Sequence, residues 1–192
     1  MFSVYFKIGI HHILDIYSYD HLLFLICLTA VYLLHQWKQI LILITAFTLG
    51  HTTSLILATF HLIKLPSSLI EVLIPVTIIF TGLWNIISIK NNPEFKTYII
   101  KYLSALFFGL IHGLGFSNYL QSLLYNEKNI ITALFAFNVG IEIGQIFVVI
   151  VIMFLNIFII NILKLNRRDW INIFSGAGIG IAITLIINRL AI

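Results

Sequence analysis

Six ionisable side chains fall inside, or at the mouths of, apolar stretches that are otherwise lipid-soluble: Asp20, His21, His51, Glu71, His112 and Glu142. A carboxylate or a cation at the centre of a bilayer costs roughly 2.5 to 3.5 kcal/mol on insertion scales, so a chain that keeps several of them has a use for them. Imidazole and carboxylate together suit borderline divalent metals such as nickel, cobalt or zinc, whereas copper(I) prefers Cys or Met. These residues predict a metal-binding site inside a membrane bundle.

Further polar residues are predicted to support this site. Asn138, Glu142 and Gln145 follow one another at i, i+4 and i+7, which places them on one narrow helix face. Thr48 and Thr52 neighbour the imidazole in the second span, and a hydroxyl is a suitable acceptor to fix the tautomer of a ligand imidazole. His12 lies close enough to the mouth of the first predicted span to capture a metal ion.

These residues also have plainer structural interpretations. Asp20 stands where Asp commonly caps a helix, and a single membrane His can be a hydrogen-bonded packing residue. The pairs Gly109/Gly113 and Gly140/Gly144 predict close approach of neighbouring helices. The co-occurrence of two carboxylates and two imidazoles, with no Lys or Arg beside them in the spans, favours a bound cation or proton over packing alone.

Composition defines the class of the whole chain. Of its 192 residues, 60% are hydrophobic and 9% charged, and the mean hydropathy is +1.07, which is incompatible with a water-soluble surface. We expect an all-α, polytopic membrane helix bundle, a single transmembrane domain over residues 1–192. Because about twenty helical residues cross the hydrocarbon, we predict about six spans. They lie at about residues 20–34, 39–60, 66–89, 101–124, 130–163 and 170–190.

The segment before the first span, residues 1–19, has one basic residue and no cleavage site of small residues, so it does not resemble a signal peptide. Its aromatic and aliphatic residues recur at roughly helical spacing. We therefore expect a short amphipathic helix at the membrane interface.

Basic residues predict the orientation of the chain. With the amino terminus on side A, side B receives Lys38, Lys90, Lys96, Lys101, Lys164, Arg167 and Arg168, and side A receives Lys7, Lys64, Lys128 and Arg189. Cytoplasmic loops carry the excess of Lys and Arg, so side B is expected in the cytoplasm of a bacterium, with both termini outside its inner membrane. The net charge of +4 then requires no nucleic-acid partner. The expected partners are the lipid bilayer and a divalent metal ion, and the sequence is compatible with a homo-oligomer.

Four strings of the sequence carry a family pattern: YDHLLFL (Tyr19–Leu25), FTLGHTTSL (Phe47–Leu55), FFGLIHGLGFSNYL (Phe107–Leu120) and FNVGIEIGQ (Phe137–Gln145). In this order they closely resemble the HupE/UreJ family of bacterial membrane proteins, over essentially the whole chain. The resemblance implies six spans and a role in nickel or cobalt uptake. It implies functional residues at Asp20, His21, His51, Glu71, His112, Glu142 and Gln145. Members often carry a His six residues before the Asp-His pair, whereas His12 precedes Asp20 by eight.

Three functions are compatible with this pattern. A permease would capture a divalent ion outside, pass it along the intramembrane His and carboxylate residues and release it inward. An intramembrane hydrolase would hold zinc with the same ligands and use Glu142 or Glu71 as general base. Against the hydrolase, no helix has two His at i, i+4 with an intervening Glu. A structural subunit would use the polar residues only to hold helices together. We favour the permease.

Overall fold

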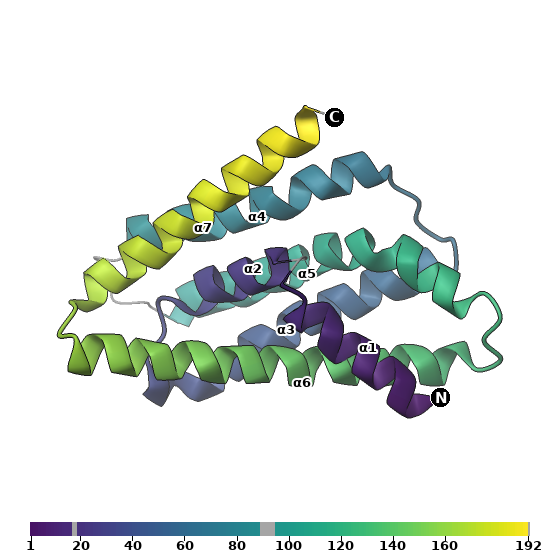
Figure 1. The fold of residues 1–192 in the computed structure, drawn as a ribbon, viewed down its shortest axis with the longest axis horizontal. Coiled ribbons are helices and arrows are strands. Elements are labelled where there is room, and N and C mark those ends of the chain that lie inside the picture. Colours follow the sequence, from purple (N-terminus) through teal and green to yellow (C-terminus); the bar gives the residue numbers. More distant parts are fainter. Residues whose placement is uncertain (17–18, 89–94, 192) are drawn as a thin grey trace.

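The computed structural model describes residues 1–16, 19–88 and 95–191, so Lys90 of the predicted orientation lies outside the described residues. Figure 1 shows helices joined by loops and no strand in this part of the chain, which confirms the all-α prediction for it. The helices are α1 (Phe2–Leu14), α2 (Asp20–Thr29), α3 (Trp37–Thr59), α4 (Ser67–Ser88), α5 (Phe95–Leu124), α6 (Ile130–Ile157) and α7 (Arg167–Leu190). A 3₁₀ turn, η1 (Leu34–Gln36), precedes α3, and a π-helical turn, η2 (Phe158–Ile162), extends α6.

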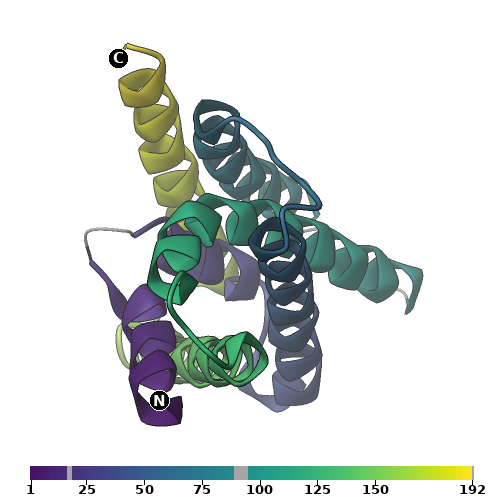
Figure 2. The same ribbon diagram turned by 90° about the vertical axis from the view of Figure 1, so that its right-hand side faces the viewer.

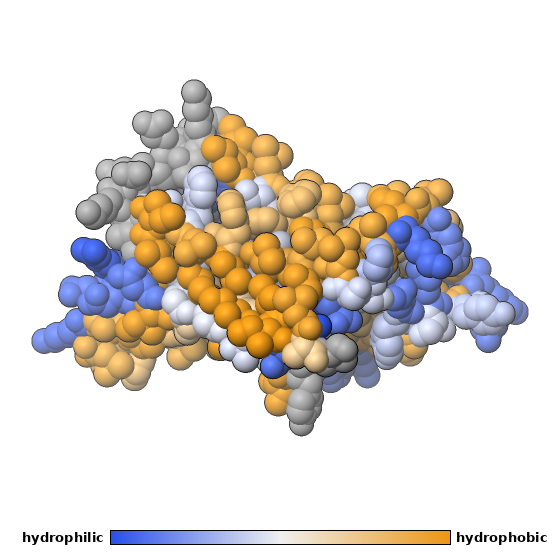
Figure 3. Space-filling view, turned by 90° about the horizontal axis from the view of Figure 1, so that it is seen from above, coloured by the Kyte–Doolittle hydropathy of each residue, from blue (hydrophilic) through white to orange (hydrophobic). Residues whose placement is uncertain are grey.

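Among the residues that the structure describes, five helices are long and apolar enough to cross a membrane. The crossing stretches are Leu34–Thr59, Ser67–Ser88, Tyr98–Leu124, Ile130–Ile162 and Arg167–Leu190, close to five of the six predicted spans. Figure 3 shows a mostly hydrophobic surface over the middle of the α4 and α7 face, with hydrophilic residues toward both ends of the long axis. This is the pattern expected of a protein whose flanks contact lipid.

The predicted first span, residues 20–34, is not confirmed, and with it the count of six spans. Helix α2 has 10 residues and ends at Thr29, so it is about 15 Å long, half the thickness of the hydrocarbon. The apolar run continues past this point, but the chain turns: the Tyr32 amide bonds the Thr29 carbonyl and Arg167 Nη2 donates to the Val31 carbonyl (2.7 Å). The hydropathy of the sequence does not predict such a turn.

Helices α1 and α2 are each too short to run the length of the bundle, and they cover it one after the other. At one end, here called end A, the Tyr5 hydroxyl donates to Glu127 Oε2 (3.1 Å), and residues 60–66 and 124–130 connect helices there. From end A, α1 runs along α6 as far as the contact of Ile13 with Gly144. From there α2 continues to end B, where residues 30–36 and 162–167 lie (Figure 1). Helix α1 therefore packs along α6, and the interfacial position expected for residues 1–19 stays a prediction.

Glycines set the closest helix contacts. A Cβ on Gly109 of α5 would overlap the Phe47 carbonyl oxygen of α3, and one on Gly50 of α3 would overlap the Leu106 carbonyl of α5. A Cβ on Gly140 of α6 would likewise overlap the Phe6 carbonyl of α1. The close approach predicted for Gly109 and Gly140 is therefore confirmed, and the structure adds Gly50. These contacts hold α3 against α5 and α1 against α6, the helices that carry several of the imidazoles described below.

Helix α7 packs on α4 at the margin of the bundle (Figure 2). Pro75 inside α4 cannot donate to the Glu71 carbonyl four residues earlier. That carbonyl instead accepts a hydrogen bond from Arg189 Nη1, near the end of α7. The oxygen freed by the proline is thus satisfied by a cation from another helix, a partner that the sequence pattern does not reveal.

Candidate metal centre

A cavity of about 850 Å³ enters the half of the bundle nearer end A. Its wall combines residues of α1, α2, α4, α5 and α7. The ionisable side chains that line it include His12, Asp20, His21, Glu71, His112 and Arg189. The break between α1 and α2 makes this possible, because it places the end of one helix and the start of the next at the same depth. Discontinuous helices of this kind commonly form ion sites in membrane proteins.

Three imidazoles converge at this depth, and we call His12, His21 and His51 the imidazole cluster. They come from the last turn of α1, the first turn of α2 and the middle of α3. Each offers one ligand atom, and these three atoms lie within 4.8 Å of one another. Ligand atoms of a tetrahedral zinc site are about 3.3 Å apart. Modest side-chain rotations would therefore bring the cluster to ligand spacing.

The ring nitrogens of the cluster are mostly without hydrogen-bond partners. His12 Nε2, His21 Nε2 and both nitrogens of His51 are buried and unpaired. A buried polar group without a partner costs about 1 to 3 kcal/mol, so several of them in one place need a compensating ligand. A divalent metal supplies that compensation, since neutral imidazole nitrogens are its preferred ligands in proteins.

Asp20 orients His21 at the edge of the cluster. His21 Nδ1 donates to Asp20 Oδ1 (3.0 Å), and the His21 backbone amide donates to the same oxygen (2.9 Å). With its proton held at Nδ1, His21 carries its ring lone pair on Nε2, which is buried and has no hydrogen-bond partner. A carboxylate that fixes the tautomer of a ligand imidazole in this way typically also raises its basicity. Asp20, predicted to be a metal ligand, thus accepts two hydrogen bonds from His21 through one oxygen, and its role as a ligand stays a prediction.

His112 stands beside the cluster, with its ring centroid 5.2 Å from that of His21. Thr77 Oγ1 donates its only hydrogen to the Ile74 carbonyl (2.7 Å), so at its 3.0 Å contact with His112 Nε2 it must accept. His112 therefore carries its proton on Nε2. Its Nδ1 is buried, unpaired and free to act as a further ligand.

Thr77→Val tests this assignment through stability. The substitution keeps the side-chain shape but leaves the buried His112 Nε2–H without an acceptor, at a cost of about 1 to 3 kcal/mol. We expect a lower unfolding temperature in detergent, measured by intrinsic fluorescence. Thr184→Val is the control, because Thr184 is exposed and bonds only the Gly180 carbonyl in its own helix. Equal unfolding temperatures for the two variants would contradict the assigned hydrogen bond.

The predicted carboxylate ligands Glu71 and Glu142 do not join the imidazole cluster in the part of the chain that the structure describes. Glu71 is exposed at the cavity wall. Glu142 lies at the seam of α3 and α6, where its Oε1 accepts from Thr45 Oγ1 (2.7 Å). Neither position brings a carboxylate to the three nitrogens.

The residues predicted to support the site form a ladder between α3 and α6. Thr52 Oγ1 donates to Asn138 Oδ1 (2.6 Å) and Thr48 Oγ1 donates to Gln145 Oε1 (2.9 Å), and these two acceptors flank Glu142 on α6. The predicted stripe on α6 is therefore real, and it faces another helix. Its hydroxyl partners bond α6 and not the His51 ring, whose two nitrogens stay unpaired.

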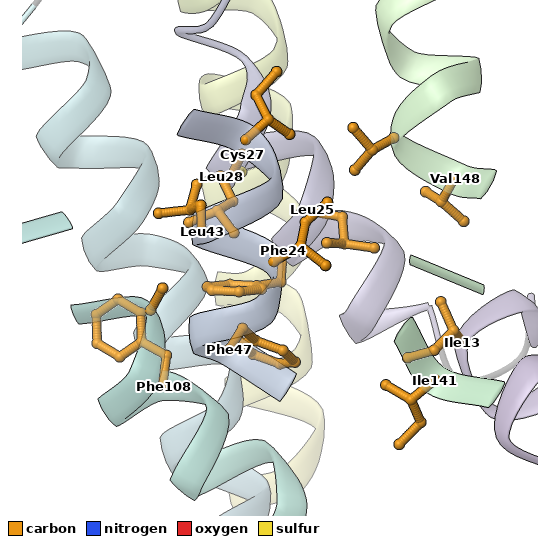
Figure 4. Packing of buried hydrophobic residues seen from close by; sticks show 14 of the residues in the cluster. Ile13, Phe24, Leu25, Cys27, Leu28, Leu43, Phe47, Phe108, Ile141 and Val148 are labelled. Atoms are coloured by element: carbon orange, nitrogen blue, oxygen red, sulfur yellow. The ribbon is translucent and has the colours of Figure 1, made fainter. Parts of the chain in front are cut away.

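An aromatic floor, made of Phe24, Phe47 and Phe108, lies beneath the imidazoles on the side of end B. The three rings stand one helical turn from His21, His51 and His112 respectively, and Figure 4 shows them packed together. The Phe24 centroid is 4.9 Å from that of Phe47 and 5.0 Å from that of His112. Phe24 and Phe47 are almost fully buried. This layer separates the cavity from end B.

Comparison with known proteins gives one match. A family model described as HupE / UreJ protein matches residues 1–189, nearly the whole chain. No curated protein matches the chain. No solved structure matches it either.

Proposed function

The chain belongs to the HupE/UreJ family, and on that premise we propose that it is a membrane permease that takes a divalent transition metal from end A, binds it at the imidazole cluster and passes it toward end B. The observation that carries the proposal is the convergence of His12, His21 and His51, with four buried and unpaired nitrogens, beside a cavity of about 850 Å³. The metal is the cargo, and the cavity is its approach.

The donor set supports a borderline divalent ion. The cluster offers imidazole nitrogens alone, and the single Cys27 is buried against Gly178 in the packing of α2 and α7, one to two turns below the cluster. Copper(I) would call for thiolate or thioether ligands, and calcium or magnesium for a cage of oxygens. Nickel, cobalt and zinc remain, in accord with the nickel or cobalt uptake that the resemblance implies.

Transport requires that the metal ion can dissociate from the site as well as bind to it. In this conformation the aromatic floor closes the route toward end B, so the conformation is the one that receives the metal. Phe24 belongs to the short α2, which begins at Asp20, after α1 has ended at Leu14. Movement of this half-length helix would displace one ring of the floor and one ligand, His21, at the same time.

The hydrolase alternative needs a carboxylate beside the metal to act as general base. Glu142 bonds Thr45 at the α3–α6 seam, Glu71 is exposed, and Asp20 is engaged by His21. None of the three is placed to activate a metal-bound water, and we do not propose a hydrolase.

Metal uptake into proteoliposomes tests the permease directly. Vesicles that contain the protein should accumulate Ni²⁺, Co²⁺ or Zn²⁺ above empty vesicles, and His51→Ala should reduce the accumulation to background. His61→Asn is the control, because His61 is exposed and its left-handed backbone (φ 56°) also suits Asn. If the protein binds metal but the vesicles do not accumulate it, the protein is a metal-binding membrane protein and the permease proposal is wrong.

Thiol labelling tests the proposed orientation, in which end B is cytoplasmic. In a Cys27→Ala background, a cysteine at the exposed Asn126 of end A should react with an impermeant thiol reagent in intact cells. A cysteine at the exposed Asn166 of end B should react only after the membrane is opened, since the basic residues there favour the cytoplasm. The reverse pattern would mean that the cavity opens inward and that the metal is exported.

A further inference from the structure

A second polar cavity, of about 300 Å³, lies at end B, on the opposite side of the aromatic floor. We call it the basic cavity. It is formed by the turn after α2, by η1 and by the first turns of α5 and α7. The polar residues that line it are Tyr32, His35, Gln36, Tyr98, Lys101 and Arg167.

The charge of the basic cavity is one-sided. Lys101 and Arg167 both face it, and no carboxylate lines it among the described residues. The one described acid near Arg167 in the chain, Asp169, accepts a hydrogen bond from Asn166 Nδ2 (3.4 Å) instead. Two cations that line one cavity without a counter-charge give that cavity a positive potential, which favours the binding of an anion.

Hydrogen-bond donors also converge there. Arg167 is held in place by its bond to the Val31 carbonyl, which occupies one of its five N–H groups. The Lys101 ammonium lies 5.1 Å from the centre of the Tyr32 ring. The Tyr32 hydroxyl is buried without a partner, and Tyr98 Oη accepts from Gln36 Nε2 (3.3 Å), which leaves its own hydrogen to donate. These donors together suit an acceptor that carries several oxygens, such as a phosphate group.

An apolar cleft continues from the basic cavity between α4 and α5. The two share Val31, Tyr32 and Lys101, and the cleft is lined further by Leu28, Phe80 and Ile100, among others. Ile100 is exposed on the flank of α5. The cleft is small, with a volume of about 40 Å³, so an acyl chain would lie along the exposed flank of α5 beside it. A phospholipid combines a phosphate for the basic cavity with an apolar chain for that flank.

We propose that the basic cavity binds the phosphate of an anionic phospholipid through Lys101 and Arg167, with the Tyr32 hydroxyl as a third donor. Basic pockets between helices at the cytoplasmic face commonly bind anionic headgroups. The site is separate from the imidazole cluster and does not depend on metal transport. It anchors the turn after α2, the segment on which the position of Phe24 depends.

Lipid titration tests this site. Protein purified in detergent is titrated with phosphatidylglycerol, with phosphatidylcholine or with inorganic phosphate, and the unfolding temperature is followed. Phosphatidylglycerol should stabilise the protein more than phosphatidylcholine, and phosphate alone should have little effect. Lys101→Gln/Arg167→Gln should weaken the apparent affinity for phosphatidylglycerol about 25-fold, at about fivefold for each cation. Lys164→Gln/Arg168→Gln, which removes two cations of end B outside the cavity, should change it little.

Tyr32→Phe keeps the packed ring and removes only the unpaired hydroxyl. It therefore tests the site even if the double variant does not fold. It should also weaken the response to phosphatidylglycerol. Equal responses in the wild type, Tyr32→Phe and both double variants would overturn the site. Stabilisation by inorganic phosphate as strong as that by phosphatidylglycerol would overturn the assignment to a lipid and point to a soluble anion.

Discussion

His51→Ala should lower the affinity for Ni²⁺, Co²⁺ and Zn²⁺ by more than about a hundredfold, because loss of a residue that only supports a ligand already costs 10- to 100-fold. His51 is fully buried, and neither of its ring nitrogens has a hydrogen-bond partner among the described residues. Affinity would be measured by competition with a chromophoric chelator.

Because His51→Ala opens a cavity in the core, His12→Ala is the companion variant. His12 is only half-buried, and its loss should disturb the fold less while removing another ligand of the same cluster. His61→Asn should bind metal as the wild type does. Unchanged affinity in both His51→Ala and His12→Ala would show that the imidazole cluster is a packing feature.

Asp20→Ala should weaken metal binding by about 10- to 100-fold, the usual effect of removing a carboxylate that orients a ligand imidazole. The carboxylate holds the proton of His21 at Nδ1 and leaves the ring lone pair on Nε2. Asp20→Asn retains an oxygen that can accept this hydrogen bond but lacks the charge, so its loss of affinity should be smaller.

Comparing the loss of metal affinity in Asp20→Asn and Asp20→Ala shows whether Asp20 orients His21 or coordinates the metal directly. If Asp20→Asn is as damaging as Asp20→Ala, the charge itself is needed, as it would be for a carboxylate bound to the metal. If both variants bind like the wild type, the contact of Asp20 with His21 has no role in metal binding.

Much of the fold follows from the sequence, because a long apolar stretch in a bilayer must be helical to satisfy its backbone. The bounds of α3, α4, α6 and α7 fall within three residues of most predicted limits, with η2 extending α6. The close contacts at Gly109 and Gly140 were also predictable, since small residues at this spacing admit a neighbouring backbone. The short α2 was not, because the turn after it depends on Arg167, more than a hundred residues away.

The site was predictable only in part, for a related reason. Sequence spacing indicates which face of a helix is polar but not which helix that face meets. Glu142 stands on the expected stripe, yet Thr45 is its partner and the imidazoles are elsewhere. Conversely, His12 was assigned a marginal role because α1 was expected at the interface. The packing of Gly9 on α6 carries α1 inward and makes His12 a member of the cluster.

X-ray absorption spectroscopy of the metal-loaded protein tests the central claim most directly. The edge and the fine structure of bound Ni²⁺ or Zn²⁺ report the number and type of ligands. The wild type should show the multiple scattering of at least three imidazoles, with metal–nitrogen distances of about 2.0 to 2.1 Å for zinc, and His51→Ala should lose one of them. A shell of oxygen ligands alone, or a spectrum unchanged by removal of His12, His21 and His51 together, would contradict a metal centre at the imidazole cluster.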